Sequence, residues 1–151
     1  MKKLLLVLAV MFAGRSAFAQ VEGHVTWAYA AKKVSATEAV ILLKATIDDN
    51  WHIYSAYIKE GGPIKTSFTF SPSREYSLSG TATEPTPLSK IEKAFNNMTV
   101  TYFEKSVIFQ QKIKLKSAGA TVVKGQLEYM TCNDKKCLPP EDVDFSIPVG
   151  K

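Results

Sequence analysis

Hydrophobic and polar residues alternate along most of the chain, and residues 106–116 show the pattern most clearly. This stretch has an apolar face and a basic face, formed by Phe109, Ile113 and Leu115 on one side and Lys112, Lys114 and Lys116 on the other. A period of two residues is typical of a β-strand with one face buried and one face in water. Residues 38–48 carry a dense run of aliphatic and β-branched side chains, which indicates a buried strand.

Similar patterns predict the remaining strands. They are expected at residues 21–34, 51–57, 64–70, 76–80, 99–103, 121–130 and 143–147, with Pro148 at the end of the last one. Residues 81–90 contain two prolines and few apolar side chains, which predicts a loop, and residues 91–97 form either one helical turn or a loop. About eight or nine short strands separated by turn residues predict an all-β fold with two packed sheets, a β-sandwich.

The first residues have the composition of an export signal. Lys2 and Lys3 precede an apolar stretch at residues 4–13 that is too short to cross a bilayer, and residues 17–19 form a small-x-small cleavage motif. We therefore expect a signal peptide at residues 1–19 and one soluble, exported domain at residues 20–151, in a bacterial periplasm. Without the three basic residues of the signal, 16 basic and 14 acidic residues give a charge of +2, which does not favour nucleic-acid binding.

The two cysteines of the chain, Cys132 and Cys137, lie in a short loop between two predicted strands. Strands on either side of such a loop bring the two sulfurs within bridging reach. Residues 139–140 are both proline and lack a backbone N–H, so strand pairing cannot begin there. Lys135 and Lys136 stand beside Cys137, where positive charge favours the thiolate. The pattern predicts an exposed, exchangeable cysteine pair at one end of the sheet.

Two hypotheses account for the cysteine pair, a redox site and a structural disulfide. A ring of six residues contributes only about 2 kcal/mol to stability through loop closure. A domain of 132 residues, 151 less the 19 of the signal, has a core large enough not to need this bridge. The placement therefore favours thiol–disulfide exchange, in which one thiolate attacks a partner disulfide and a second thiol releases the mixed species. The alternative is a non-catalytic, exported binding or adaptor sandwich with a structural bridge.

Other chemistry has weaker support in the sequence. His24, His52 and the two cysteines are candidate metal ligands, and Met98 and Met130 suit copper, but only Met130 has a short spacing to the cysteines. The sequence contains no glycine-rich phosphate loop and no pair of carboxylates or Ser-His-Asp set arranged for catalysis. We therefore expect neither a metal nor an organic cofactor.

Four stretches of the chain together carry a resemblance to a known family. They are residues 49–55 (Asp-Asn-Trp-His-Ile-Tyr-Ser), residues 61–63 (Gly-Gly-Pro), Phe95 with Tyr102, and residues 129–141, which contain both cysteines followed by Leu-Pro-Pro-Glu. The last stretch is the most specific. On these residues the chain resembles the N-terminal periplasmic domain of DsbD, a transmembrane reductase that carries electrons to periplasmic disulfide proteins. The resemblance covers nearly all of residues 20–151.

The resemblance implies an immunoglobulin-like β-sandwich with the cysteine pair at one end. It implies that Cys137 is the exchanging thiol, which forms the mixed disulfide with partners, and that Cys132 resolves this intermediate. Phe95 is similar to the phenylalanine of a cap loop that shields the pair until a partner displaces the loop. Tyr54 is similar to an aromatic residue near the cysteines, and His52 stands where the family often has tyrosine.

The resemblance also implies an activity and partners. It predicts a protein-disulfide reductase, or an exchange component, that passes reducing equivalents to periplasmic thiol–disulfide proteins, with a thioredoxin-like protein as donor or acceptor. The chain ends at Lys151, so the expected membrane electron conductor is a separately encoded protein. Two features depart from the family. Four residues separate the cysteines, one fewer than in well-known members, and Lys93 and Ala94 replace an acidic pair before Phe95.

Overall fold

The computed structural model describes residues 23–150, so the predicted signal peptide lies outside the described part. This part forms eleven β-strands and one short 3₁₀ helix, η1. In chain order these elements are β1 (Val25–Lys33), β2 (Glu38–Ile47), β3 (His52–Tyr54), β4 (Ser67–Phe70), β5 (Tyr76–Thr83), β6 (Leu88–Glu92), η1 (Lys93–Phe95), β7 (Met98–Phe103), β8 (Ser106–Leu115), β9 (Thr121–Tyr129), β10 (Thr131–Cys132) and β11 (Glu141–Val149). Within residues 23–150, no helix has the length and apolar character needed to cross a membrane.

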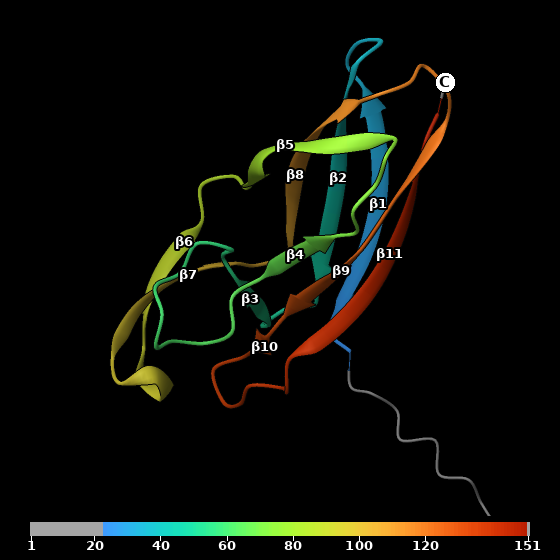
Figure 1. Cartoon of the computed structure of the whole chain (residues 1–151). Helices are drawn as coiled ribbons and strands as arrows, with labels where there is room; N and C mark the ends of the chain where they lie inside the picture. Colours follow the sequence, from blue (N-terminus) through green and yellow to red (C-terminus); the bar gives the residue numbers. More distant parts are fainter. Residues whose placement is uncertain (1–22, 151) are drawn as a thin grey trace, which may run out of the picture.

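Two sheets face each other and form the predicted β-sandwich (Figure 1). One sheet has the strand order β1-β2-β8-β5 and the other has the order β11-β9-β4. Every strand pair in the two sheets is antiparallel. β1 also lies against β11, so the two sheets meet along one side.

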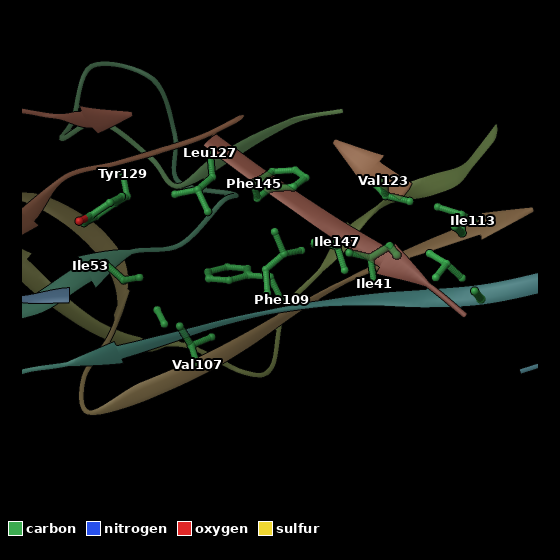
Figure 2. Packing of buried hydrophobic residues seen from close by; sticks show 14 of the residues in the cluster. Ile41, Ile53, Val107, Phe109, Ile113, Val123, Leu127, Tyr129, Phe145 and Ile147 are labelled. Carbon is green, nitrogen blue, oxygen red and sulfur yellow. The ribbon is translucent and has the colours of Figure 1, made fainter. Parts of the chain in front are cut away.

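The core lies between these two sheets and follows the alternation of the sequence. β8 alternates between exposed and buried residues along its whole length, which confirms the strand predicted there. On its buried face, the ring of Phe109 lies 5.0 Å from that of Phe68 and 5.8 Å from that of Phe103, between ring centroids. Figure 2 shows Phe109 near the middle of the cluster, with Tyr129 toward one end and Ile113 toward the other. Each fully buried side chain of this size contributes about 1.5–3 kcal/mol through burial.

A third sheet, with the order β10-β3-β7-β6, carries the cysteine loop at one end of the sandwich (Figure 1). β3 links it to the core, because Ile53 packs in the main cluster whereas Tyr54 packs in a second, smaller cluster with Val100 and Cys132. All three residues of β3 are buried. The strand predicted at residues 51–57 is thus confirmed only at residues 52–54, and Tyr57, beyond its end, is 56% exposed.

The loop predicted at residues 81–90 is wrong. β5 continues to Thr83 and β6 begins at Leu88, so only residues 84–87, which include the two prolines, connect the strands. β5 and β6 are edge strands of different sheets, and an edge strand has one backbone edge in water. Such strands need few apolar residues, and their sequence therefore resembles that of a loop. A register shift between Ser79 and Thr83, beside Gly80 at φ 72°, interrupts the pairing of β5.

Two strand ends also differ from the prediction. β11 continues through Pro148 to Val149, with Pro148 opposite Val122. β11 is an edge strand, where the missing N–H of a proline can point to solvent without the loss of a ladder hydrogen bond. β4 begins at Ser67 rather than at residue 64, and Ile64 is 39% exposed in the irregular segment that precedes it.

Candidate functional site

Cys132 and Cys137 are joined in a disulfide, with their Cα atoms 4.0 Å apart. Cys132 is the last residue of β10, which pairs with β3, and Cys137 forms an isolated β-bridge with it. Between them, the side-chain oxygen of Asn133 accepts hydrogen bonds from the backbone N–H groups of Lys135 and Lys136, at 2.8 Å each. Pairing of β11 with β9 begins only after the two prolines. The predicted proximity of the cysteines and the predicted role of the prolines are both confirmed.

The two cysteines differ in exposure. Cys137 is exposed, whereas Cys132 is 1% exposed and packs with Tyr54 and Val100. Strand pairing causes this difference, because β10 lies beside β3 and keeps Cys132 in the second cluster, while the turn after it carries Cys137 to the surface. The pair lies at the end of its sheet as predicted, but Cys137 alone is accessible to a partner protein.

A buried polar cluster lies beside Cys132. The residue directly opposite Cys132 on β3 is His52, which is 3% exposed. Nε2 of His52 lies 2.9 Å from Nζ of Lys90 and 3.3 Å from Oη of Tyr54. Lys90 and Tyr54 both contact a carboxylate oxygen of Glu92, at 3.1 Å and 3.3 Å. The structure thus brings the predicted residues His52 and Tyr54 next to Cys132, together with two charged residues of β6.

Hydrogen bonding fixes the protonation of this cluster. The ammonium group of Lys90 can only donate, so Nε2 of His52 accepts its hydrogen bond and the proton of the neutral ring is on Nδ1. Burial and the charge of Lys90 lower the pKa of His52 from 6.5 to about 4, against opposing effects of Glu92 and Asp134. Burial and the neighbouring Glu92 raise the pKa of Tyr54, whose hydroxyl donates to that carboxylate. At neutral pH the cluster therefore holds a neutral imidazole, a neutral phenol and one ion pair.

Lys90 and Glu92 are functional candidates that the sequence alone did not reveal. Both lie on β6, two positions apart, and therefore share a strand face. The two prolines and the low apolar content of residues 81–90 predicted a loop there, and a loop gives no basis for placing two side chains on one face. If residues 88–92 are taken as a strand, the spacing of two positions places Lys90 and Glu92 on the same face. This spacing is the signal in the sequence that could have identified them as a pair.

Phe95 is the last residue of η1, in the connection between β6 and β7. Of the two alternatives for residues 91–97, the helical turn is thus confirmed, at residues 93–95. Asn96 and Asn97 follow at φ values of 55° and 56° and turn the chain toward β7. Phe95 is half-buried and lines a cleft of about 500 Å³ together with Cys137. The residue expected to cap the cysteines therefore shares a cleft with the exposed one, and the capping function itself stays a prediction.

The remaining candidate metal ligands lie in two places. His24 stacks on Trp51, with ring centroids 3.8 Å apart, and its Nδ1 lies 3.0 Å from a carboxylate oxygen of Asp48. Met98 and Met130 pack against the second cluster. Among residues 23–150, no three His, Cys, Asp or Glu side chains form a group that could hold a metal ion.

Comparison with known families identifies one match over most of the chain. The family model described as "Thiol:disulfide interchange protein DsbD, N-terminal" matches residues 21–148. No curated protein gives a significant match.

Solved structures with a similar fold include two that contain the DsbD N-terminal domain of Neisseria meningitidis. One is the reduced domain, with 19% identity, a TM-score of 0.54, and coverage of 82% of this chain and 86% of that chain. The other is a complex of the DsbD and PilB N-terminal domains, with 18% identity, a TM-score of 0.56, and coverage of 86% and 87%. The N-terminal periplasmic domain of ScsB from Proteus mirabilis has 23% identity, a TM-score of 0.56, and coverage of 83% of this chain but only 46% of that chain. These similarities and the facing sheets confirm the immunoglobulin-like β-sandwich.

Proposed function

The chain belongs to the family of DsbD N-terminal domains of thiol:disulfide interchange proteins, and we propose that it passes reducing equivalents to partner proteins through Cys132 and Cys137. Family membership supports thiol–disulfide exchange in general. The observation that carries the finer assignment is the difference in exposure between the two cysteines. Cys137 is exposed and Cys132 is 1% exposed, so a partner sulfur can reach the first and not the second.

In the proposed reaction, the thiolate of reduced Cys137 attacks a disulfide of the partner, forms a mixed disulfide and releases one partner thiolate. The thiolate of Cys132 then attacks Sγ of Cys137, closes the intramolecular disulfide and releases the second partner sulfur. The protons of the two cysteine thiols reach the two partner thiolates through solvent, so two electrons and two protons pass to the partner. A dithiol of a donor protein reduces the module again by the reverse sequence.

Two features of the cleft support the proposed roles. Lys135 and Lys136 precede Cys137 on the surface turn, and positive charge beside a thiol favours its thiolate, the nucleophile of the exchange. Phe95 lines the same cleft as Cys137, which supports its assignment to a cap that a partner must displace. His52 and Tyr54 border the resolving cysteine, and we propose that they set its surroundings rather than touch the partner.

The proposal extends to place and partners. We propose that residues 1–19 are removed on export and that residues 20–151 act in the periplasm, in line with the export signal of the sequence and with the periplasmic ScsB domain of similar fold. The partners proposed are thiol–disulfide proteins, in line with the complex between the DsbD and PilB N-terminal domains. A membrane electron conductor is the proposed source of electrons.

Trapping with single-cysteine variants tests the division of roles. Cys132→Ser should accumulate a mixed disulfide between Cys137 and an oxidised thioredoxin-like protein, visible on a non-reducing gel. Cys137→Ser is the matched control and should accumulate little, because the remaining thiol is buried. Equal trapping by the two variants, or no trapping by either, contradicts the proposal.

The reduction potential separates the proposal from a structural disulfide. An exchanging pair should equilibrate with glutathione buffers at about −120 to −270 mV, whereas a potential below about −300 mV marks a bridge that such buffers cannot open. The reduced protein should have an unfolding free energy only about 2 kcal/mol below that of the oxidised protein, because the ring that the bridge closes is short. A much larger loss supports the structural alternative.

A further inference from the structure

We propose that the partner protein presents an acidic surface around the sulfur that it exchanges with Cys137, an inference that rests on the function proposed above. The observation behind it is the charge of the cleft that contains Cys137. Its lining has four lysines and two acidic residues, a formal charge of +2, formed by Lys90, Lys93, Lys135 and Lys136 with Glu92 and Asp134.

The charges of the cleft are not equally available to a partner. Lys90 and Glu92 pair with each other at 3.1 Å, and their side chains are only 24% and 18% exposed. Lys93 and Lys135 are exposed, and they belong to different walls, η1 on one side and the cysteine loop on the other. Asp134 is the exposed acidic residue of the lining. Positive charge therefore flanks the approach to the exposed cysteine from both sides.

The turn between the cysteines holds the charged loop in place. The side chain of Asn133 accepts hydrogen bonds from the N–H groups of Lys135 and Lys136, and its own N–H donates to the carbonyl of Lys136 at 2.9 Å. Nζ of Lys136 lies 5.7 Å from the ring centroid of Trp51. Because this turn leads directly into Cys137, a partner cannot reach the sulfur without approaching these lysines.

The exchange reaction brings the partner surface close to these lysines. A disulfide bond of about 2 Å must form between Cys137 and the partner sulfur, so the surface around that sulfur comes within the screening distance of about 8–10 Å of the lysines. A basic surface would meet like charges and is rejected, whereas an acidic surface is attracted and accelerates the encounter. The lysines thus select the partner by its charge as well as favour the thiolate.

An apolar feature at the same cleft favours a protein partner over a small acidic thiol. Ile91 lines the cleft and is 65% exposed, more than any other large apolar side chain among residues 23–150. It lies on β6, an edge strand of the third sheet. An edge strand leaves one row of backbone N–H and C=O groups unpaired, and a strand of another protein can pair with this row whereas a small thiol cannot.

The test uses the reduced domain of residues 20–151 and three peptides, each with one internal disulfide, that differ only in acidic, neutral or basic flanking residues. At an ionic strength of about 20 mM, we expect the acidic peptide to oxidise the cysteine pair about tenfold faster than the basic one. At about 500 mM the ratio should fall toward one, because salt screens exposed charges. Each rate is divided by the rate with the neutral peptide, which corrects for any change in the reactivity of Cys137 itself.

Charge-reversal variants test whether the preference for acidic peptides depends on the lysines of the cleft. Lys93→Glu combined with Lys135→Glu should bring the ratio of acidic to basic rates to one or below. Lys112→Glu combined with Lys114→Glu makes the same change of charge on the exposed face of β8, outside the cleft, and should leave the ratio unchanged. Equal rates for all three peptides overturn this inference and leave the proposed function intact. No reaction with any peptide overturns both, and an equal effect of the two double variants overturns the assignment to the cleft.

Discussion

Acidification should destabilise the folded protein through His52, and His52→Gln should remove this part of the pH dependence. The ring is 3% exposed and accepts a hydrogen bond from Lys90 at 2.9 Å. Burial and the charge of Lys90 lower its pKa to about 4, whereas the unfolded chain keeps the ordinary pKa of about 6.5. Between these two pH values the unfolded chain binds a proton that the folded chain does not. Stability is therefore complete above about pH 6.5 and is lost as the pH falls toward 4.

The size of the effect follows from the two pKa values of His52. Their difference corresponds to about 3 kcal/mol of unfolding free energy once both states are protonated. Between pH 7.5 and pH 4.5 the expected loss is about 2.5 kcal/mol, because protonation of the folded state is then incomplete. Glutamine offers a carbonyl oxygen to Lys90 without binding a proton. Carboxylates that titrate in both proteins contribute equally, so the wild-type protein should lose about 2.5 kcal/mol more than the variant.

Urea unfolding followed by circular dichroism at pH 7.5 and pH 4.5 measures this difference. His24→Gln is the matched control, because it removes the other histidine of the chain and leaves the polar cluster around His52 intact. Lys90→Met should raise the pKa of His52, since the charge of Lys90 helps to lower it, and a histidine NMR titration detects the change. If wild-type protein and His52→Gln lose the same stability within about 0.5 kcal/mol, the neutral, buried state of His52 is refuted.

Three substitutions test the cap and the core. Phe95→Ala should raise the rate at which iodoacetamide alkylates reduced Cys137 several-fold, because the ring lines the cleft of that cysteine, and an unchanged rate contradicts a shielding cap. Phe109→Ala should lower the unfolding free energy by about 3–5 kcal/mol in urea titrations, and a loss below about 1 kcal/mol would contradict its central position. Gly125→Ala should cost at least about 1 kcal/mol, because a Cβ there meets the backbone of β4 and a ring of β11. Gly150→Ala is its control, since nothing lies within 4 Å of that Cβ, and equal stability of the two variants would refute the close approach.

The strands of the sandwich were predictable from the sequence because each has one face in the core and one face in water. β8 is the clearest case, with Phe109 buried and Lys112 exposed along one unbroken alternation. The third sheet lacks this signal. β3 is buried on both sides, so the strand predicted at residues 51–57 has no exposed face, and β6 is an edge strand whose exposed residues include Leu88 and Ile91. Sequence periodicity reports the contrast between core and solvent, and it fails where a strand has no such contrast.

The part of the site formed by residues close in sequence was predictable, and the part formed by contacts between distant strands was not. The cysteine pair and the prolines after it lie within a few positions, so turn chemistry alone describes them. The resemblance to the family added His52 and Tyr54. Lys90 joins His52 across 38 positions of sequence, and their contact depends on the order of β3, β7 and β6 in the sheet. Strand order is decided by packing of the whole domain, and no local pattern encodes it.

The two walls of the cleft differ in how firmly the fold holds them, and this difference suits sequential exchange. Cys132 lies on β10 beside β3, whose Ile53 is fully buried in the main core, so movement of this wall requires disruption of the sandwich. The wall that carries Phe95 connects β6 and β7, and β6 pairs with β7 alone, exposes Ile91 and contacts β3 only through the polar side chains of Lys90 and Glu92. Segments with few buried contacts open at a lower cost in free energy than core strands. This difference supports the proposed order of exchange, in which a partner displaces the Phe95 wall and Cys132 then resolves the mixed disulfide.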